Sequence, residues 1–146
     1  MKILVSACLL GRNCKYSGGN NRNGAVISFC RGKDVVAVCP EVEAGLPVPR
    51  PPVEIRDGKV VRADGSDWDS VYRAGVAAVL RRCHASRETL SCAILKAGSP
   101  TCGVHEVYDG TFSHRKVPGQ GVLAEALASL GVPVFDEHDV ENGKIK

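Results

Sequence analysis

The chain has 146 residues, of which 44% are hydrophobic and 24% charged, with a formal net charge of +3. These values fit one globular domain over residues 1–146 with a core of its own. No apolar run reaches the roughly 20 residues of a membrane span, and the few aromatic residues and small charge argue against a nucleic-acid surface. We therefore expect no membrane and no nucleic acid as partners. The oligomeric state stays open, with a dimer as one candidate.

The N-terminal residues 1–8 combine one positive charge with a short apolar run. This run is too short for the hydrophobic region of a signal peptide, so we interpret it as a core strand and expect a cytoplasmic protein. An odd number of cysteines in a reducing compartment argues against a disulfide framework and directs attention to metal binding or catalysis. The seven cysteines are Cys8, Cys14, Cys30, Cys39, Cys83, Cys92 and Cys102.

Short apolar segments predict four strands, and three of the strands run toward a cysteine. The segments are residues 2–7, 35–39, 92–96 and 132–135. Pro40 stops the second strand directly after Cys39, and the prolines that follow predict a stiff, largely extended loop.

The segments between the strands predict helices and turns. Helices are expected at 25–30, from about 69 to 85 after a capping box formed by Ser66 and Asp69, and after Gly121 as far as Gly131. Two Asp-Gly pairs predict hairpins at 53–62 and 107–112. The polar tail, 136–146, is expected to fray.

Strands that alternate with helices predict an α/β fold: a small Rossmann-like, mainly parallel sheet flanked by helices, with one or two β-hairpin appendages. In such sheets ligands bind outside the carboxyl ends of the strands. Cys8 and Cys39 fall at such ends, and Cys102 lies a few residues past a third. We therefore expect these three cysteines to meet at one point, whereas cysteines inside regular elements are expected to be small core residues.

Three converging thiolates suit a soft metal or an iron–sulfur cluster, and a cluster with only three protein ligands leaves one iron open for catalysis. No C-x-x-C pair is present, which excludes zinc-ribbon and thioredoxin-type sites. Glu41 is a candidate base and Ser99 a candidate hydrogen-bond donor. Both also have structural interpretations, as a capping carboxylate and as a turn residue. His105 and His114 are interpreted as surface histidines.

Four motifs together resemble the "domain of unknown function 523" family, and they cover nearly the whole chain in the same order. They are residues 5–16, 39–50, 95–103 and 108–121. Characterised members of this family are similar to thiouracil desulfurases. Two positions depart from the family pattern: Ala97-Gly98 stand where a basic residue is expected, and Thr101 replaces a serine.

The resemblance implies a 4Fe–4S cluster on Cys8, Cys39 and Cys102, whose fourth iron takes the sulfur of a thiolated pyrimidine base or nucleoside. Thiouracil and water would then give uracil and hydrogen sulfide without redox change. Glu41 would activate the water, and Ser99 would orient the substrate. Arg12, Lys15 and Arg50 are candidate contacts to the polar edges of the pyrimidine.

Two other functions remain open from the sequence. In the first, Cys39 or Cys102 forms a persulfide and transfers sulfur without a cluster. In the second, the protein is a non-enzymatic iron–sulfur sensor or accessory protein, with Cys14 as a fourth ligand.

Overall fold

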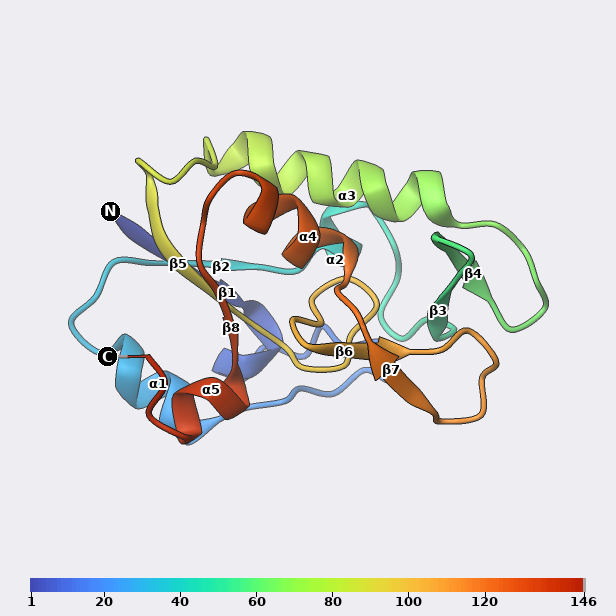
Figure 1. Cartoon of the computed structure of the whole chain (residues 1–146), viewed down its shortest axis with the longest axis horizontal. Coiled ribbons are helices and arrows are strands. Elements are labelled where there is room, and N and C mark those ends of the chain that lie inside the picture. Colours follow the sequence, from blue (N-terminus) through green and yellow to red (C-terminus); the bar gives the residue numbers. More distant parts are fainter. Residues whose placement is uncertain (146) are drawn as a thin grey trace.

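Four parallel strands form the central sheet of the protein, in the order β2–β1–β5–β8 (Figure 1). The structure is a computed structural model, and it describes residues 1–145. All four strands coincide with the apolar runs that predicted them. They are β1 (Lys2–Ser6), β2 (Val35–Val38), β5 (Leu90–Leu95) and β8 (Val134–Asp136).

Helices cover both faces of this sheet, which gives the protein three layers (Figure 1). One face carries α1 (Gly24–Cys30) and α5 (Glu137–Glu141), and the other carries α2 (Pro40–Glu43), α3 (Asp69–Arg82) and α4 (Val122–Ser129). Successive strand residues point to opposite faces. Leu4 therefore packs in one core with Val79 of α3, whereas Val5 packs in a second core with Val26 of α1.

Two antiparallel hairpins lie beyond the carboxyl ends of the parallel strands (Figure 1). They are formed by β3 (Val53–Arg56) with β4 (Lys59–Arg62), and by β6 (Glu106–Tyr108) with β7 (Lys116–Pro118). The predicted α/β class, with a parallel sheet flanked by helices and hairpin appendages, is confirmed. Within residues 1–145, no helix has both the length and the apolar character that crossing a bilayer requires.

Two predictions about loops differ from the structure. Pro40 is the first residue of α2, a position where a backbone N–H would have no partner within the helix, so proline loses nothing there. The chain after β2 therefore begins as a helix and not as an extended loop. Asp109-Gly110 does not form a two-residue turn, because the buried Glu54 carboxylate accepts hydrogen bonds from the Gly110 and Phe112 N–H groups. Strands β6 and β7 are instead joined by the longer loop 109–115.

The start of α3 and the C-terminal tail also differ from expectation. Trp68, not Ser66, precedes α3, because the Ser66 hydroxyl bonds to Asp64. The tail does not simply fray but forms α5. Asp136 and Asp139 make a reciprocal capping box at its start, with hydrogen bonds of 2.9 and 3.0 Å.

Candidate active site

Four cysteines line one cavity of about 50 Å³ at the carboxyl ends of the parallel strands: Cys8, Cys14, Cys39 and Cys102. Cys8 lies in the short 3₁₀ helix η1 (Ala7–Leu10) that follows β1, and Cys39 lies between β2 and α2. Cys102 lies seven residues after Leu95, the last residue of β5. The sheet therefore brings together the three cysteines that the sequence placed at strand ends, with Cys14 added from the polar loop.

The remaining three cysteines lie elsewhere, in the hydrophobic cores. Cys92 is buried in the core under α1, and Cys30 packs against the same core. Cys83, at the end of α3, packs against the opposite core. Cys92 is therefore a core residue as expected, whereas Cys30 and Cys83 are half-buried at the edges of the cores.

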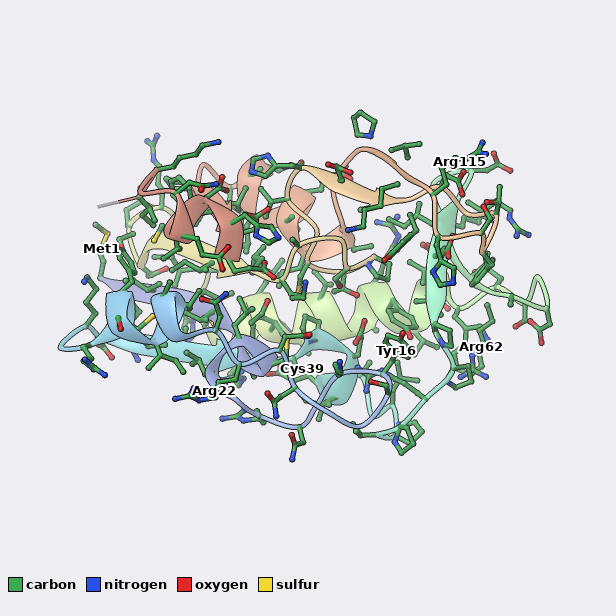
Figure 2. The ribbon with its side chains drawn as sticks, turned by 90° about the horizontal axis from the view of Figure 1, so that it is seen from below. Met1, Tyr16, Arg22, Cys39, Arg62 and Arg115 are labelled. Carbon is green, nitrogen blue, oxygen red and sulfur yellow. The ribbon has the colours of Figure 1, made fainter. Side chains whose placement is uncertain are left out.

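Figure 2 shows where Cys39, one of the cysteines that line the cavity, lies along the molecule. Cys39 is near the middle, between Met1 at one end and the hairpin residues Arg62 and Arg115 at the other. Tyr16 lies on the hairpin side of Cys39. The site is therefore built between the sheet and the hairpins.

Within residues 1–145, the one set of three His, Cys, Asp or Glu side chains with ligand atoms within 4.8 Å of one another is His105, Asp136 and Asp139, so no three cysteine sulfurs lie that close together. Thiolate sulfur is the usual protein ligand of an iron–sulfur cluster, and several cysteines around one cavity suit such a group.

The protonation of the thiols depends on burial and on nearby donors. Burial raises the pKa of Cys8, although a hydrogen bond from Asn21 and the charge of Lys96 oppose the rise. Burial likewise raises the pKa of Cys102. The pKa of Cys39 is lowered to about 7, first by a hydrogen bond from the Cys14 thiol and also by the Val42 N–H in α2. Cys39 is therefore the thiol most readily converted to a thiolate, which is the form that binds metal.

Glu41, on α2, lies beside the cysteines with a fixed carboxylate. One oxygen accepts a hydrogen bond of 2.9 Å from the Thr101 hydroxyl, and the other forms an ion pair with Arg50. The Arg50 side chain is only 1% exposed and also donates to the Cys14 carbonyl at 2.8 Å. Arg50 therefore links the loop that carries Cys14 to helix α2, which carries Glu41.

Ser99 combines a structural contact with an unused donor. Its hydroxyl oxygen accepts from the N–H groups of Thr101 and Cys102, at 3.1 and 3.0 Å, which fixes the turn before Cys102. Among the described residues no acceptor is recorded for its O–H, and Ser99 lines the cavity. The hydroxyl can therefore shape the turn and donate to a ligand at the same time.

A second cavity, of about 470 Å³, adjoins the first and is large enough for a small molecule. Lys15, Glu41, Lys96 and Ser99 line both cavities. The walls of the outer cavity are largely aromatic and apolar, which suits a planar ring. These wall residues include Tyr16, Pro51, Pro52, Tyr72, Tyr108 and Phe112.

Several residues of the site were not predicted, and one predicted contact lies elsewhere. Thr101 and Lys96 both line the cysteine cavity, although only their place in a motif singled them out in the sequence. Arg12 is in the lining of neither cavity. His114 lines the outer cavity while remaining exposed, and His105 bonds to Asp139 away from the cysteines, at 2.8 Å.

The loop that carries Cys102 is held by the N-terminus of α4. The Gly121 N–H donates to the Gly103 carbonyl at 2.8 Å, and the first two amides of α4 donate to the carbonyls of Pro100 and Thr101. A Cβ atom at Gly121 would lie 2.4 Å from the Thr101 carbonyl carbon. Glycine is therefore required at this position for the helix to approach the loop.

Comparisons with known proteins show the family of the chain. The chain is 36% identical, over 150 residues, to the uncharacterized protein YbbK of Bacillus subtilis, with 96% of this chain and 98% of the relative covered. It is also similar to the solved structure of TudS, a DUF523 protein described as a 4Fe–4S-dependent thiouracil desulfidase. The identity is 34% and the TM-score 0.87, with 97% of this chain and 93% of that chain covered. Residues 3–139 match the 2-thiouracil desulfurase family, and the chain belongs to this family.

Proposed function

We propose that the protein is a 4Fe–4S-dependent desulfidase that releases hydrogen sulfide from a thiolated pyrimidine base or nucleoside. Family membership supports a desulfurating enzyme and a small thiouracil-like substrate. The observation that carries the proposal is the convergence of Cys8, Cys39 and Cys102 on one cavity that adjoins an aromatic-walled cavity. We assign these three cysteines as the cluster ligands.

The cluster, when bound, supplies an open iron that prefers soft sulfur and polarises a carbon–sulfur bond. The remaining steps belong to the side chains of this chain. The aromatic walls stack on the pyrimidine ring and exclude bulk water. Water replaces sulfur at the ring carbon, so that one water is consumed for each hydrogen sulfide released.

Glu41 is assigned as the base that accepts a proton from this water. Thr101 and Arg50 each hold one of its oxygens, which fixes the carboxylate orientation and leaves further lone pairs for the water. Ser99 donates its free O–H to the substrate. Burial, and to a smaller extent the charge of Glu41, raise the pKa of Tyr72 to about 12. Its hydroxyl therefore stays protonated and is a second neutral donor in the outer cavity.

Anaerobic reconstitution, iron and sulfide analysis and a hydrogen-sulfide assay with 2-thiouracil test this function. We expect about four irons per chain, a broad visible absorbance and sulfide release. Cys39→Ser should lose the cluster, whereas the matched control Cys83→Ser, in the core, should retain it.

Two results would replace the proposal. A colourless protein that still transfers sulfur would favour the persulfide alternative. A cluster that is lost in Cys14→Ser and releases no sulfide in the wild type would favour a four-ligand sensor.

A further inference from the structure

Lys96 is a cationic residue that lines both cavities. It follows directly after β5, and its backbone N–H donates to the Ser6 hydroxyl at 3.0 Å. Its side chain is 27% exposed. Because Lys96 lines the cysteine cavity and the outer cavity, it lies where substrate and cluster would meet.

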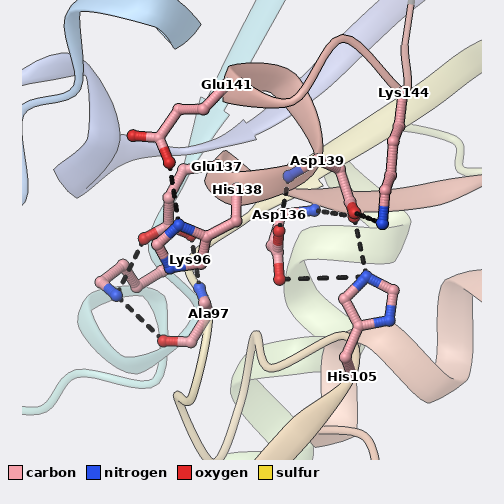
Figure 3. Close-up of polar contacts among 9 residues, drawn as sticks. All are labelled: Lys96, Ala97, His105, Asp136, Glu137, His138, Asp139, Glu141 and Lys144. Carbon is pink, nitrogen blue, oxygen red and sulfur yellow. Dashed lines mark hydrogen bonds and ion pairs between the residues drawn. The ribbon is translucent and has the colours of Figure 1, made fainter.

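A buried carboxylate from a different element holds this ammonium in place (Figure 3). The Glu137 side chain is 7% exposed, and one of its carboxylate oxygens lies 2.9 Å from the Nζ of Lys96. Its other oxygen accepts a hydrogen bond of 2.7 Å from the Ala97 N–H. Glu137 therefore fixes both the side chain of Lys96 and the backbone that follows it.

The position of Glu137 is itself fixed by the start of α5. Asp136 and Asp139 form the capping box, and His105 donates to the Asp139 carboxylate at 2.8 Å (Figure 3). His105 lies three residues after Cys102 in the chain. The contacts of α5 thus reach both sides of the Cys102 loop, and they hold Glu137 against Lys96.

The ammonium of this ion pair lies close enough to the cysteine cavity to act on Cys8: burial raises the pKa of that thiol, and the charge of Lys96 opposes the rise to a smaller extent. Lys96 lines both cavities, whereas Glu137 lines neither. An ammonium group has three N–H donors. Glu137 and the Ala97 carbonyl, at 3.0 Å, take two of them, and no acceptor for the third is recorded among residues 1–145. The third donor is therefore available to a ligand.

The expected ligand of this donor is an anionic sulfur group. With the cluster bound, the three ligating thiolates would add negative charge to the cysteine cavity, and the sulfide released by desulfuration is in large part the hydrosulfide anion at neutral pH and above. A cation in this place offsets that charge and offers a charge-assisted hydrogen bond. Burial strengthens the attraction because the surroundings have a low dielectric constant.

We propose that Lys96 is a catalytic residue that binds the sulfur leaving the substrate, and that Glu137 is a positioning residue acting through Lys96. This inference rests on the proposed function. Lys116 offers a matched control, because it is an exposed lysine close to Gly98 that lines neither the cysteine cavity nor the outer cavity.

Titration of the reconstituted holoprotein with sodium hydrosulfide, followed by its visible spectrum, tests the inference. We expect Lys96→Met and Lys96→Gln to weaken hydrosulfide binding about tenfold or more, since a charge-assisted hydrogen bond is lost. Lys96→Arg, which keeps the charge, should recover most of the affinity, and Glu137→Gln should give an intermediate loss. Lys116→Met should bind as the wild type does.

The reduction potential of the cluster supplies a readout that a purely structural role would not change. Removing a nearby cation favours the less negative, oxidised state, so the potentials of Lys96→Met and Lys96→Gln should shift downward at equal iron content. Unchanged potential and hydrosulfide affinity in either of these variants would overturn the inference. A wild type without cluster or sulfide release would instead overturn the proposed function, so the two failures are distinguishable.

Discussion

The close contact between α4 and the Cys102 loop predicts that Gly121→Ala disrupts the site from outside it. Gly121 has ordinary extended backbone angles, φ −72° and ψ 167°, so alanine meets no backbone strain there. Its new methyl group would, however, lie 2.4 Å from the Thr101 carbonyl carbon and 2.8 Å from the Cys102 nitrogen. Backbone atoms cannot rotate away as a flexible side chain can, so α4 and the loop must move apart.

The expected cost has two parts. Overpacking at a well-packed contact costs about 1–3 kcal/mol. The separation also weakens hydrogen bonds between the start of α4 and the loop, of 2.8, 3.1 and 2.8 Å, and each contributes about 1 kcal/mol. We therefore expect the free energy of unfolding to fall by about 2–4 kcal/mol, since the same movement relieves part of the overpacking.

Urea unfolding of the cluster-free protein measures this cost, and iron analysis after reconstitution measures the effect on the site. Gly24→Ala is the matched control, because a Cβ atom at Gly24 would meet nothing within 4 Å. The control should be neutral or slightly stabilising, as alanine suits a helix better than glycine. Gly121→Ala with the stability and iron content of the control would refute the reasoning.

Three further predictions concern single carboxylates and a hydroxyl. Glu41→Gln should retain the cluster but lose turnover by about 100-fold or more, as measured by sulfide release, because the base is removed. Thr101→Val should lower turnover at unchanged iron content, whereas Thr101→Ser should preserve it by keeping the donor to Glu41. Burial raises the pKa of Asp139, but hydrogen bonds from the Asp136 N–H and from His105 outweigh it, so the pKa lies below its usual value. The stabilising contribution of ionised Asp139 is present above the unfolded pKa of about 3.9 and is lost as the pH falls through the folded value. In Asp139→Asn, the free energy of unfolding measured in urea should therefore fall less steeply as the pH is lowered.

The sheet and the convergence of the cysteines could be predicted because both depend on local patterns. A β-branched apolar run identifies a buried strand, and in a parallel sheet all carboxyl ends meet at one edge. Cys8 and Cys39 therefore needed no long-range information. Cys102 needed little more, because Gly98 and Pro100 stop the strand a few residues before it.

The rest of the site could not be predicted because it depends on pairs that are distant in sequence. The Thr101 hydroxyl contacts Glu41 across 60 positions, and Glu137 contacts Ala97 across 40. No local pattern marks such partners. The C-terminal helix is a different case, since Asp136 and Asp139 have the spacing of a capping box and could have indicated its start.

The two ion pairs beside the cavities are explained better by function than by stability. Arg50 with Glu41, and Lys96 with Glu137, each bury one charged group, the Arg50 guanidinium and the Glu137 carboxylate, whose desolvation offsets most of its attraction to the partner. Apolar side chains of similar volume would stabilise the fold as well or better. Each pair nevertheless gives the same cavities one fixed charged group: an acceptor from Glu41 and a donor from Lys96. The proposed reaction takes a proton from water and releases an anionic sulfur, so it uses both the acceptor and the donor in fixed positions.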